Sequence, residues 1–230
     1  MMQISKVNFQ SLYRIARILI LVMLIIIPMQ ILVFVFSPPP DSVKGFFELY
    51  RLNPLLGLLS LDFLYLFNNM IVVLVYLALF VLLYQERPVT VVLALVLGII
   101  GVACYYPSNP AFELLTLSNQ YFQALPDQQI IYLAAGEAVM AGYTGTSFDV
   151  YYVSSTICLL LFAFSIIKST KFKKSVGIWG LISGIFMIIP STAGMIGMIF
   201  SFLSLIPWVV FIVLLMSKFK QLSVNIQNNE

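Results

Sequence analysis

The chain has 230 residues, of which 61% are hydrophobic and 9% are charged, with a formal net charge of +3. Its mean hydropathy is +1.03. Soluble domains carry about 25% charged residues and avoid large exposed apolar patches, so this composition excludes a water-soluble globular protein.

Apolar stretches that approach or reach the length of a membrane span recur along the chain. A helix crosses about 30 Å of hydrocarbon with about 20 residues. The first stretch follows basic residues, as in a signal peptide, but it exceeds the roughly 7–15 apolar residues of such a signal, so we expect it to remain as a span. We predict an all-α fold, a polytopic membrane helical bundle that forms one integral membrane domain over residues 1–230, with six transmembrane helices at about residues 18–36, 63–84, 89–106, 150–167, 175–190 and 195–216.

Two longer segments separate these spans on the side that we predict to be outside the cell. Residues 37–61 open with a proline run and then mix apolar and charged side chains, which favours an interfacial helix. Residues 107–146 contain two helix-start signals, Asn109-Pro110 and Pro126-Asp127, and the second helix is expected to end near Gly142. We predict an outer helical hairpin between spans three and four.

The basic residues predict the orientation of the chain. Short loops rich in Lys and Arg stay in the cytoplasm. Only Lys44 and Arg51 fall on the opposite side. We therefore predict a multi-pass protein with cytoplasmic N- and C-termini, and the lipid bilayer as its first partner. The other ten of the twelve basic residues lie beside alternate gaps between spans: Lys6, Arg14, Arg17, Arg87, Lys168, Lys171, Lys173, Lys174, Lys218 and Lys220.

Acidic and amide side chains near the outer ends of the spans are the candidate ligand-binding residues. Ionisable groups within a membrane are costly and mark functional sites. The alternative is that the acids cap helices or lie at the interface, where a carboxylate costs little. Asp62 and Asp149 each follow a serine by two residues in a weak internal repeat, SLDFLY against SFDVYY. The full candidate set is Glu137, Glu113, Asp62, Asp149, Asn68, Asn69, Asn109 and Thr146.

Glu137 is the strongest single candidate, because it lies in the middle of an apolar helical run where capping cannot explain it. We expect Lys44 or Arg51 from the first outer segment as its partner. Thr146 belongs to a glycine-rich segment, residues 141–147, that is either a broken-helix binding loop or a helix end followed by a turn.

The small and aromatic residues indicate how the helices pack and where they meet the membrane surface. Gly180 and Gly184 have the GxxxG spacing of closely packed membrane helices, and Gly177, Gly194 and Gly197 extend the small-residue faces of spans five and six. These faces predict close helix packing, with a membrane protein partner as the alternative. Four tyrosines near the outer ends of the spans are typical of an aromatic belt: Tyr105, Tyr106, Tyr151 and Tyr152.

No catalytic, cofactor or metal motif is present in the sequence. The chain has no histidine, which excludes Ser-His and Cys-His pairs and histidine-bound metals. The basic residues are spread over helix ends and form no patch, so we predict no nucleic-acid binding. We expect no catalytic residue, no cofactor and no metal ion.

Several segments resemble a bacterial family of multi-pass membrane proteins that is known only as a domain of unknown function. The resemblance rests on SNPAFE at 108–113, LSNQY at 117–121, AAGE at 134–137, GTSF at 145–148, GMIG at 194–197 and SLIPW at 204–208. It extends over about residues 14–216 and implies a bacterial cytoplasmic-membrane protein without an assigned activity.

Three functions are compatible with these patterns. The leading hypothesis is a protein that binds a small or lipid-like ligand in an outward-facing polar cavity, in a transporter-like, sensor or protective role. A second is a membrane-embedded enzyme that uses the outer carboxylates. A third is an assembly or interaction subunit of a membrane complex, with the glycine-rich faces of spans five and six as its contact surfaces.

Overall fold

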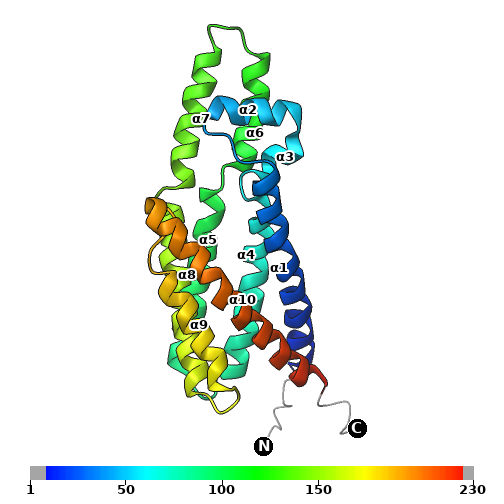
Figure 1. Cartoon of the computed structure of the whole chain (residues 1–230), viewed down its shortest axis with the longest axis vertical. Coiled ribbons are helices and arrows are strands. Elements are labelled where there is room, and N and C mark those ends of the chain that lie inside the picture. The colour runs from blue at the N-terminus through cyan, green and yellow to red at the C-terminus, as the bar shows by residue number, and fades with distance from the viewer. Residues whose placement is uncertain (1–8, 225–230) are drawn as a thin grey trace, which may run out of the picture. The chain divides into compact units, whose positions relative to one another are not determined.

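The computed structural model describes residues 9–224, and in this range the chain forms helices and no strands (Figure 1). The all-α prediction is therefore confirmed for the described residues, while Lys6 lies outside them. The helices are α1 (Gln10–Phe36), α2 (Val43–Leu52), α3 (Pro54–Leu59), α4 (Phe63–Leu83), α5 (Pro88–Ser108), α6 (Ala111–Gln123), α7 (Gln129–Tyr143), α8 (Thr146–Lys168), α9 (Lys174–Phe186) and α10 (Gly194–Val224).

The chain divides by its contacts into two compact units. Unit 1 comprises Met1–Leu24, Ile71–Gly98 and Thr156–Glu230, and unit 2 comprises Ile25–Met70 and Ile99–Ser155. Helices α1, α4, α5 and α8 therefore contribute residues to both units. Helices α9 and α10 belong to unit 1, and α2, α3, α6 and α7 belong to unit 2. The single integral membrane domain stays a prediction.

Among residues 9–224, five helical stretches are long and apolar enough to cross a membrane. The predicted fifth span, 175–190, corresponds to α9, which has 13 residues. At about 1.5 Å per residue such a helix is about 20 Å long, short of the roughly 30 Å of hydrocarbon. The five stretches are Gln10–Phe36, Phe63–Leu83, Pro88–Gln123, Gln129–Lys168 and Gly194–Ser223.

Helix α1 illustrates why these stretches suit lipid. Its side chains Ile18, Leu21, Ile25 and Leu32 are each more than half exposed, at 53%, 53%, 54% and 52%. An exposed apolar face this long is unfavourable in water and favourable against acyl chains. The structure thus carries the surface that the composition predicted.

In unit 1, α9 packs closely on α8 through small residues. A Cβ added at Gly177 would lie 2.5 Å from the carbonyl oxygen of Ala163, and one at Gly184 would lie 2.6 Å from the Leu160 side chain. Gly180 faces Ala163 and Phe211 in the same way. The glycine face of α9 is therefore occupied by helices of the same chain, as close packing requires.

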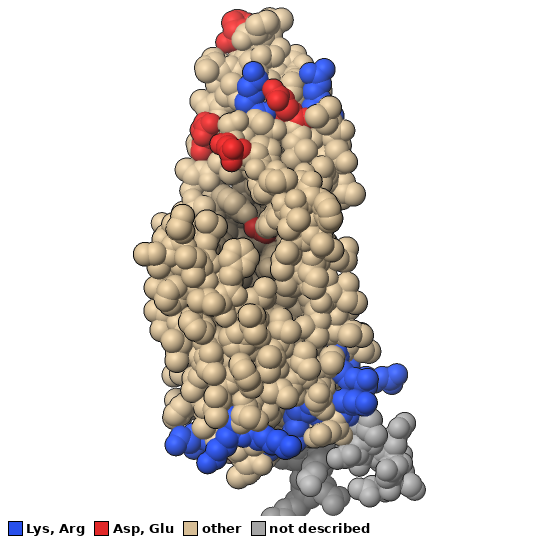
Figure 2. Space-filling model, viewed as in Figure 1, with Lys and Arg blue, Asp and Glu red and all other residues tan. Residues whose placement is uncertain are grey.

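One end of unit 1 gathers the basic helix termini (Figure 2). Gln10 donates to the carbonyl oxygen of Ser223 at 2.8 Å, which joins the start of α1 to the end of α10. The Lys218 ammonium lies 5.9 Å from the ring centroid of Phe172 in the α8–α9 connection. Lys171 of that connection donates to the carbonyl oxygen of Leu82 at 2.5 Å, close to the α4–α5 turn. The four basic segments thus lie together at this end of unit 1.

Unit 2 contains a core of its own built around α2. This helix begins at the N-cap Ser42, whose hydroxyl accepts from the Gly45 amide, and its buried residues repeat with helical spacing: Val43, Phe46, Phe47 and Tyr50. Residues of α6 complete the core, including Ala111, Leu114 and Tyr121.

Two hydrogen bonds fix α2 to α6. The Tyr50 hydroxyl donates to the carbonyl oxygen of Ala111 at 2.7 Å, and the Ser118 hydroxyl donates to that of Phe47 at 2.9 Å. Helices α6 and α7 also contact each other and lie side by side in Figure 1. The predicted interfacial helix at 37–61 is thus two helices, α2 and α3, which are packed on α6.

Candidate functional site

The candidate site begins at the turn that joins α3 to α4 in unit 2. Asn109 holds this turn, because its Nδ2 atom donates to the carbonyl oxygen of Leu61 at 2.6 Å. Its Oδ1 atom accepts from the Ala111 amide at 3.2 Å, so both ends of the Asn109 amide group are used within the protein. The next residue, Asp62, has a φ of 57°, and it is the one non-glycine residue in the described range with a left-handed backbone. Aspartate tolerates this conformation better than most residues.

The Asp62 carboxylate is half-buried and accepts a hydrogen bond from the Tyr143 hydroxyl at the end of α7. Burial raises the pKa of the Asp62 carboxyl group, and the hydrogen bond from Tyr143 opposes this rise. Among the described residues, no Lys or Arg forms an ion pair with Asp62. This carboxylate therefore lies in unit 2 without a cationic partner from the chain.

The hydroxyl groups of four tyrosines on four different helices lie within range of the charge of Asp62. The negative charge of Asp62 acts on the hydroxyl groups of Tyr65 in α4, Tyr105 in α5, Tyr143 in α7 and Tyr151 in α8. The rings of Tyr105 and Tyr151 lie 4.8 Å apart between centroids. Tyr105 is only 4% exposed, so it is a core residue and not the membrane-facing belt residue that the sequence suggested.

A buried amide continues the site along α4. The Tyr151 hydroxyl donates to Oδ1 of Asn69 at 3.3 Å. Ser155 follows Tyr151 by one turn of α8, and its hydroxyl is close to Gly101 of α5, where an added Cβ would lie 3.0 Å from Oγ. We define the polar cluster as Asp62, Asn69, Tyr143, Tyr151 and Ser155.

Polar atoms in and near this cluster lack hydrogen-bond partners. In the described part of the chain, four buried side-chain atoms are unpartnered: Gln30 Oε1, Asn68 Oδ1, Asn69 Nδ2 and Ser155 Oγ. All four belong to unit 2. Buried polar groups in native proteins are nearly always paired, so these four atoms are exceptions, and two of them belong to the polar cluster.

The remaining predicted residues do not join the cluster. Glu113 and Glu137 are exposed, on α6 and α7. Glu113 lines an open depression of about 400 Å³ between these helices, with Phe112, Thr116, Leu117, Ala135 and Val139. Such a shallow apolar hollow does not desolvate the carboxylate, which remains open to solvent.

Asp149 and Thr146 are placed at the start of α8. Thr146 is its first residue and is exposed, whereas Asp149 lies in the first turn and is half-buried. Asp62 stands in a left-handed turn before α4. The two aspartates of the sequence repeat therefore occupy different local structures. Figure 2 shows one acidic side chain at the floor of a recess.

Of the two basic residues expected to pair with Glu137, Arg51 contacts another side chain. The Arg51 guanidinium lies 4.5 Å from the ring centroid of Phe122 in α6, which is a cation–π contact. Lys44 is exposed on α2.

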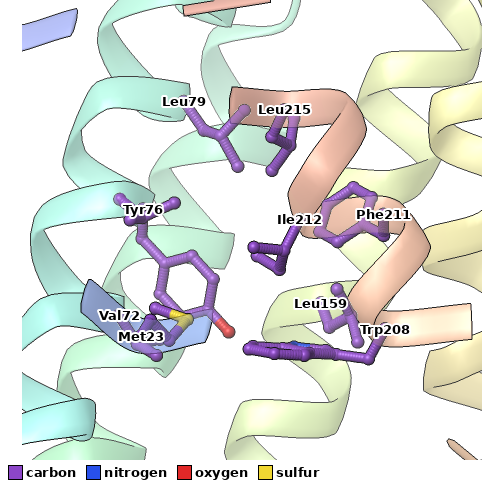
Figure 3. Close-up of a pocket in the computed structure, with 10 residues that line it drawn as sticks. Met23, Val72, Tyr76, Leu79, Leu159, Trp208, Phe211, Ile212 and Leu215 are labelled. Atoms are coloured by element: carbon purple, nitrogen blue, oxygen red, sulfur yellow. The ribbon is translucent and has the colours of Figure 1, made fainter. Parts of the chain in front are cut away.

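An enclosed pocket in unit 1 is too small to be a ligand site. Its volume is about 10 Å³, room for about one water molecule. Figure 3 shows the Tyr76 hydroxyl directed toward the indole of Trp208, with aliphatic side chains such as Leu79 and Ile212 around them. No charged side chain lines this pocket.

Within the described residues, no group of three or more Cys, Asp or Glu side chains is arranged to hold a metal ion. Cys104 and Cys158 are free thiols.

Sequence reasoning missed several members of the site. Tyr143 is one of them, because the sequence marks it only as part of the glycine-rich segment 141–147. The sequence also gives no signal for Gln30, a buried amide of unit 2 outside the polar cluster. Gln30 donates through Nε2 to the carbonyl oxygen of Leu59 at 2.8 Å and is 1% exposed. A usable signal was the i, i+4 spacing of Tyr65 and Asn69, which places two polar groups on one face of α4 shortly after Asp62.

The comparisons with known proteins identify no relative. No protein-family model matches the chain, and neither a curated protein nor a solved structure is similar to it.

Proposed function

We propose that the protein is an integral membrane protein that binds a small or lipid-like ligand at the polar cluster of unit 2, in a transporter-like, sensor or protective role. The observation that carries this proposal is that the unpartnered buried polar atoms of the described residues all lie in unit 2, which also holds a half-buried carboxylate without a cationic partner. Each such atom costs about 1–3 kcal/mol if nothing pairs with it. A ligand with complementary polar groups removes that cost when it binds.

The charge distribution supports cytoplasmic N- and C-termini. The start of α1, the α4–α5 turn, the α8–α9 connection and the end of α10 carry basic residues and lie together in unit 1. Helix α9 begins and α10 ends at that same basic end, so the chain leaves this end through α9 and comes back to it through α10. This path keeps both termini on one side. We propose that α9 and α10 together serve as the fifth and sixth crossings, with α9 crossing only part of the hydrocarbon.

Membership of the bacterial family of unknown function, and location in a bacterial cytoplasmic membrane, remain proposals that rest on the resemblance. The placement of the α6–α7 pair on the outer side rests on the positive-inside rule. The apolar exposed faces support a membrane location without selecting which membrane.

Native mass spectrometry of the protein purified from membranes tests ligand binding. We expect an additional bound mass on the wild-type chain that decreases in Ser155→Ala, because this change removes an unpartnered hydroxyl at the cluster. The matched control is Ser165→Ala, since Ser165 is a buried serine of the same helix whose hydroxyl already donates to the carbonyl oxygen of Leu161 at 2.8 Å. Equal bound mass in both variants contradicts a ligand at the cluster.

A further inference from the structure

The Asp62 carboxylate has no cationic partner among the described residues. It is half-buried, it accepts a hydrogen bond from Tyr143, and no basic side chain of the described chain neutralises it. The usual reason for a left-handed residue after a helix is to end that helix, and glycine or asparagine serves this purpose without a charge. The negative charge at position 62 is therefore not needed for the turn.

The neighbours of Asp62 favour a cation. Tyr65, Tyr105, Tyr143 and Tyr151 approach it from α4, α5, α7 and α8, and each is influenced by its charge. Tyrosine side chains near an unpaired carboxylate suit an ammonium group, because the ring quadrupole and the carboxylate both attract positive charge. A cation is favoured over an anion there, because the carboxylate repels negative charge and no lysine or arginine among the described residues pairs with it.

A second anchor lies deeper along α4 and α8. The Nδ2 atom of Asn69 and the Oγ atom of Ser155 are buried, at 2% and 8% exposure of their residues, and have no partner. The Tyr151 hydroxyl connects this pair to the aspartate, because it donates to Asn69 and also senses the charge of Asp62. Seven residues separate Asp62 from Asn69, which is about 10 Å along a helix.

We propose that unit 2 binds an organic ammonium ion whose charge pairs with Asp62 and whose neutral hydrogen-bonding group is held by Asn69 and Ser155, within about 10 Å of the charge. The inference rests on the proposed function and specifies its ligand class. The shared chemistry is an ammonium group with a neutral polar group, whether in a soluble amine or in an aminophospholipid headgroup.

Thermal unfolding in detergent with three probes tests the ligand class. N-acetylputrescine carries both the ammonium and an amide, N-pentylacetamide replaces the ammonium by a methyl group, and pentylamine lacks the amide. We expect the first to stabilise the wild-type protein most, pentylamine to stabilise it less, and N-pentylacetamide to have no effect. A wild-type protein that neither ammonium probe stabilises overturns the inference.

Two variants connect the effect to the site. Asp62→Asn keeps the shape of the side chain and removes the charge, so we expect at least a roughly thirty-fold loss of affinity for N-acetylputrescine. The matched control is Asp149→Asn, the other half-buried aspartate of unit 2, which should keep wild-type affinity. Circular dichroism of both variants establishes that they are folded. Full retention of affinity in Asp62→Asn sinks the ammonium assignment.

The outcomes separate this inference from the proposed function. If N-pentylacetamide stabilises the wild-type protein as well as N-acetylputrescine does, and Ser155→Ala abolishes both effects, the cluster binds a neutral ligand and only the ammonium inference fails. If a bound mass is present but equal in Ser155→Ala and Ser165→Ala, the proposed site itself fails. Nanodiscs of phosphatidylglycerol with and without phosphatidylethanolamine distinguish the sources: stabilisation by phosphatidylethanolamine that Asp62→Asn loses assigns the ammonium to a lipid.

Discussion

Ser155 and Ser165 provide a comparison within one helix that tests the central structural claim. Both are buried serines of α8, but the Ser155 hydroxyl is unpartnered whereas the Ser165 hydroxyl donates to the Leu161 carbonyl oxygen at 2.8 Å. Changing each to alanine removes one oxygen atom and leaves the backbone and the Cβ in place. Alanine also has the higher helix propensity, and that advantage is the same at both positions.

The two substitutions should change the free energy of unfolding differently: Ser155→Ala should raise it, and Ser165→Ala should leave it unchanged or lower it. Removal of a buried hydroxyl that lacks a partner relieves a desolvation cost of about 1–3 kcal/mol, so Ser155→Ala should stabilise the ligand-free protein by about 1 kcal/mol. Removal of a hydroxyl that is bonded costs about 0.5–1.5 kcal/mol, so Ser165→Ala should be neutral or destabilising after the gain in propensity. In a chain of this length, 1 kcal/mol corresponds to roughly 2–4 °C in Tm.

The assay is thermal unfolding in detergent, followed by intrinsic tryptophan fluorescence on protein from which bound small molecules have been removed. We expect the Tm of Ser155→Ala to exceed that of Ser165→Ala by several degrees. A Ser155→Ala variant that is destabilised as much as Ser165→Ala, or more, would mean that the Ser155 hydroxyl has a partner, and the reasoning for a binding site would lose one of its unpartnered atoms.

The remaining predictions concern packing, pH and orientation. Gly57→Ala should destabilise the protein by about 1–3 kcal/mol, because a Cβ there would lie 2.4 Å from the Tyr50 ring. Gly142→Ala should stabilise it by about 0.5–1 kcal/mol, because a Cβ there would meet nothing within 4 Å and alanine has the higher helix propensity. Both changes are measured as shifts in Tm. The pKa of Asp62 is raised by burial, so the folded state binds this proton more tightly than the unfolded state, and stability should increase as pH falls through the folded pKa toward the ordinary aspartate value. A pH–Tm profile of Asp62→Asn should lack that increase, and an identical profile would contradict the burial of this carboxyl group. Cysteine at position 171 should resist an impermeant maleimide applied to intact cells, while cysteine at position 127 should react; the reverse pattern would overturn the orientation.

Most helices were predictable because a membrane-spanning helix needs a long apolar run with polar ends. The predicted span 63–84 corresponds to α4, Phe63–Leu83, and 89–106 corresponds to α5, Pro88–Ser108. In the outer segments, the helix ends depend on local signals such as an Asn-Pro pair at a helix start, and only one of the two Asn-Pro pairs is part of the prediction. Asn109-Pro110 was recognised as a start, but Asn53-Pro54, where the Asn53 Oδ1 atom accepts from the Leu56 amide at 3.0 Å, was not. The break between α2 and α3 was therefore missed.

Glu137 shows why the site was only partly predictable. The apolar run around it suggested a helix surrounded by apolar groups, in which every side chain is desolvated. In the structure, α7 is packed mainly through one face, since Gly136 is buried and a Cβ there would lie 2.4 Å from the Val43 side chain. Successive helical residues point about 100° apart, so packing at Gly136 turns Glu137 outward. Sequence composition gives the polarity of a helix, but the identity of its packed face depends on tertiary contacts.

Sequence signals identify Asp62, Asn69 and Tyr151, but they do not connect Tyr151 to the candidate site and do not single out Tyr143. Tyr143 and Tyr151 come from segments more than eighty residues away along the chain, at separations of 81 from Asp62 and 82 from Asn69. Without aligned relatives, no local spacing can bring such residues together. Tyr151 looks like a membrane-interface anchor in the sequence because the same residue type serves both purposes.

The contrast between the two units is the strongest argument that the cluster exists for binding. In unit 1 buried hydroxyls are paired within the protein: Ser183 donates to the carbonyl oxygen of Ser204 at 3.1 Å, and Thr156 donates to that of Met187 at 3.0 Å. Unit 2 pairs buried hydroxyls as well, such as Ser118 with the Phe47 carbonyl oxygen at 2.9 Å, but the unpartnered atoms that the described residues contain all lie in that unit. A bundle selected only for stability gains nothing from an uncompensated carboxylate beside unpaired amides, because apolar residues of similar size would be less costly there. A ligand that pairs with the carboxylate and the amides would explain why these groups are retained, because stability and binding then favour different residues at the same positions.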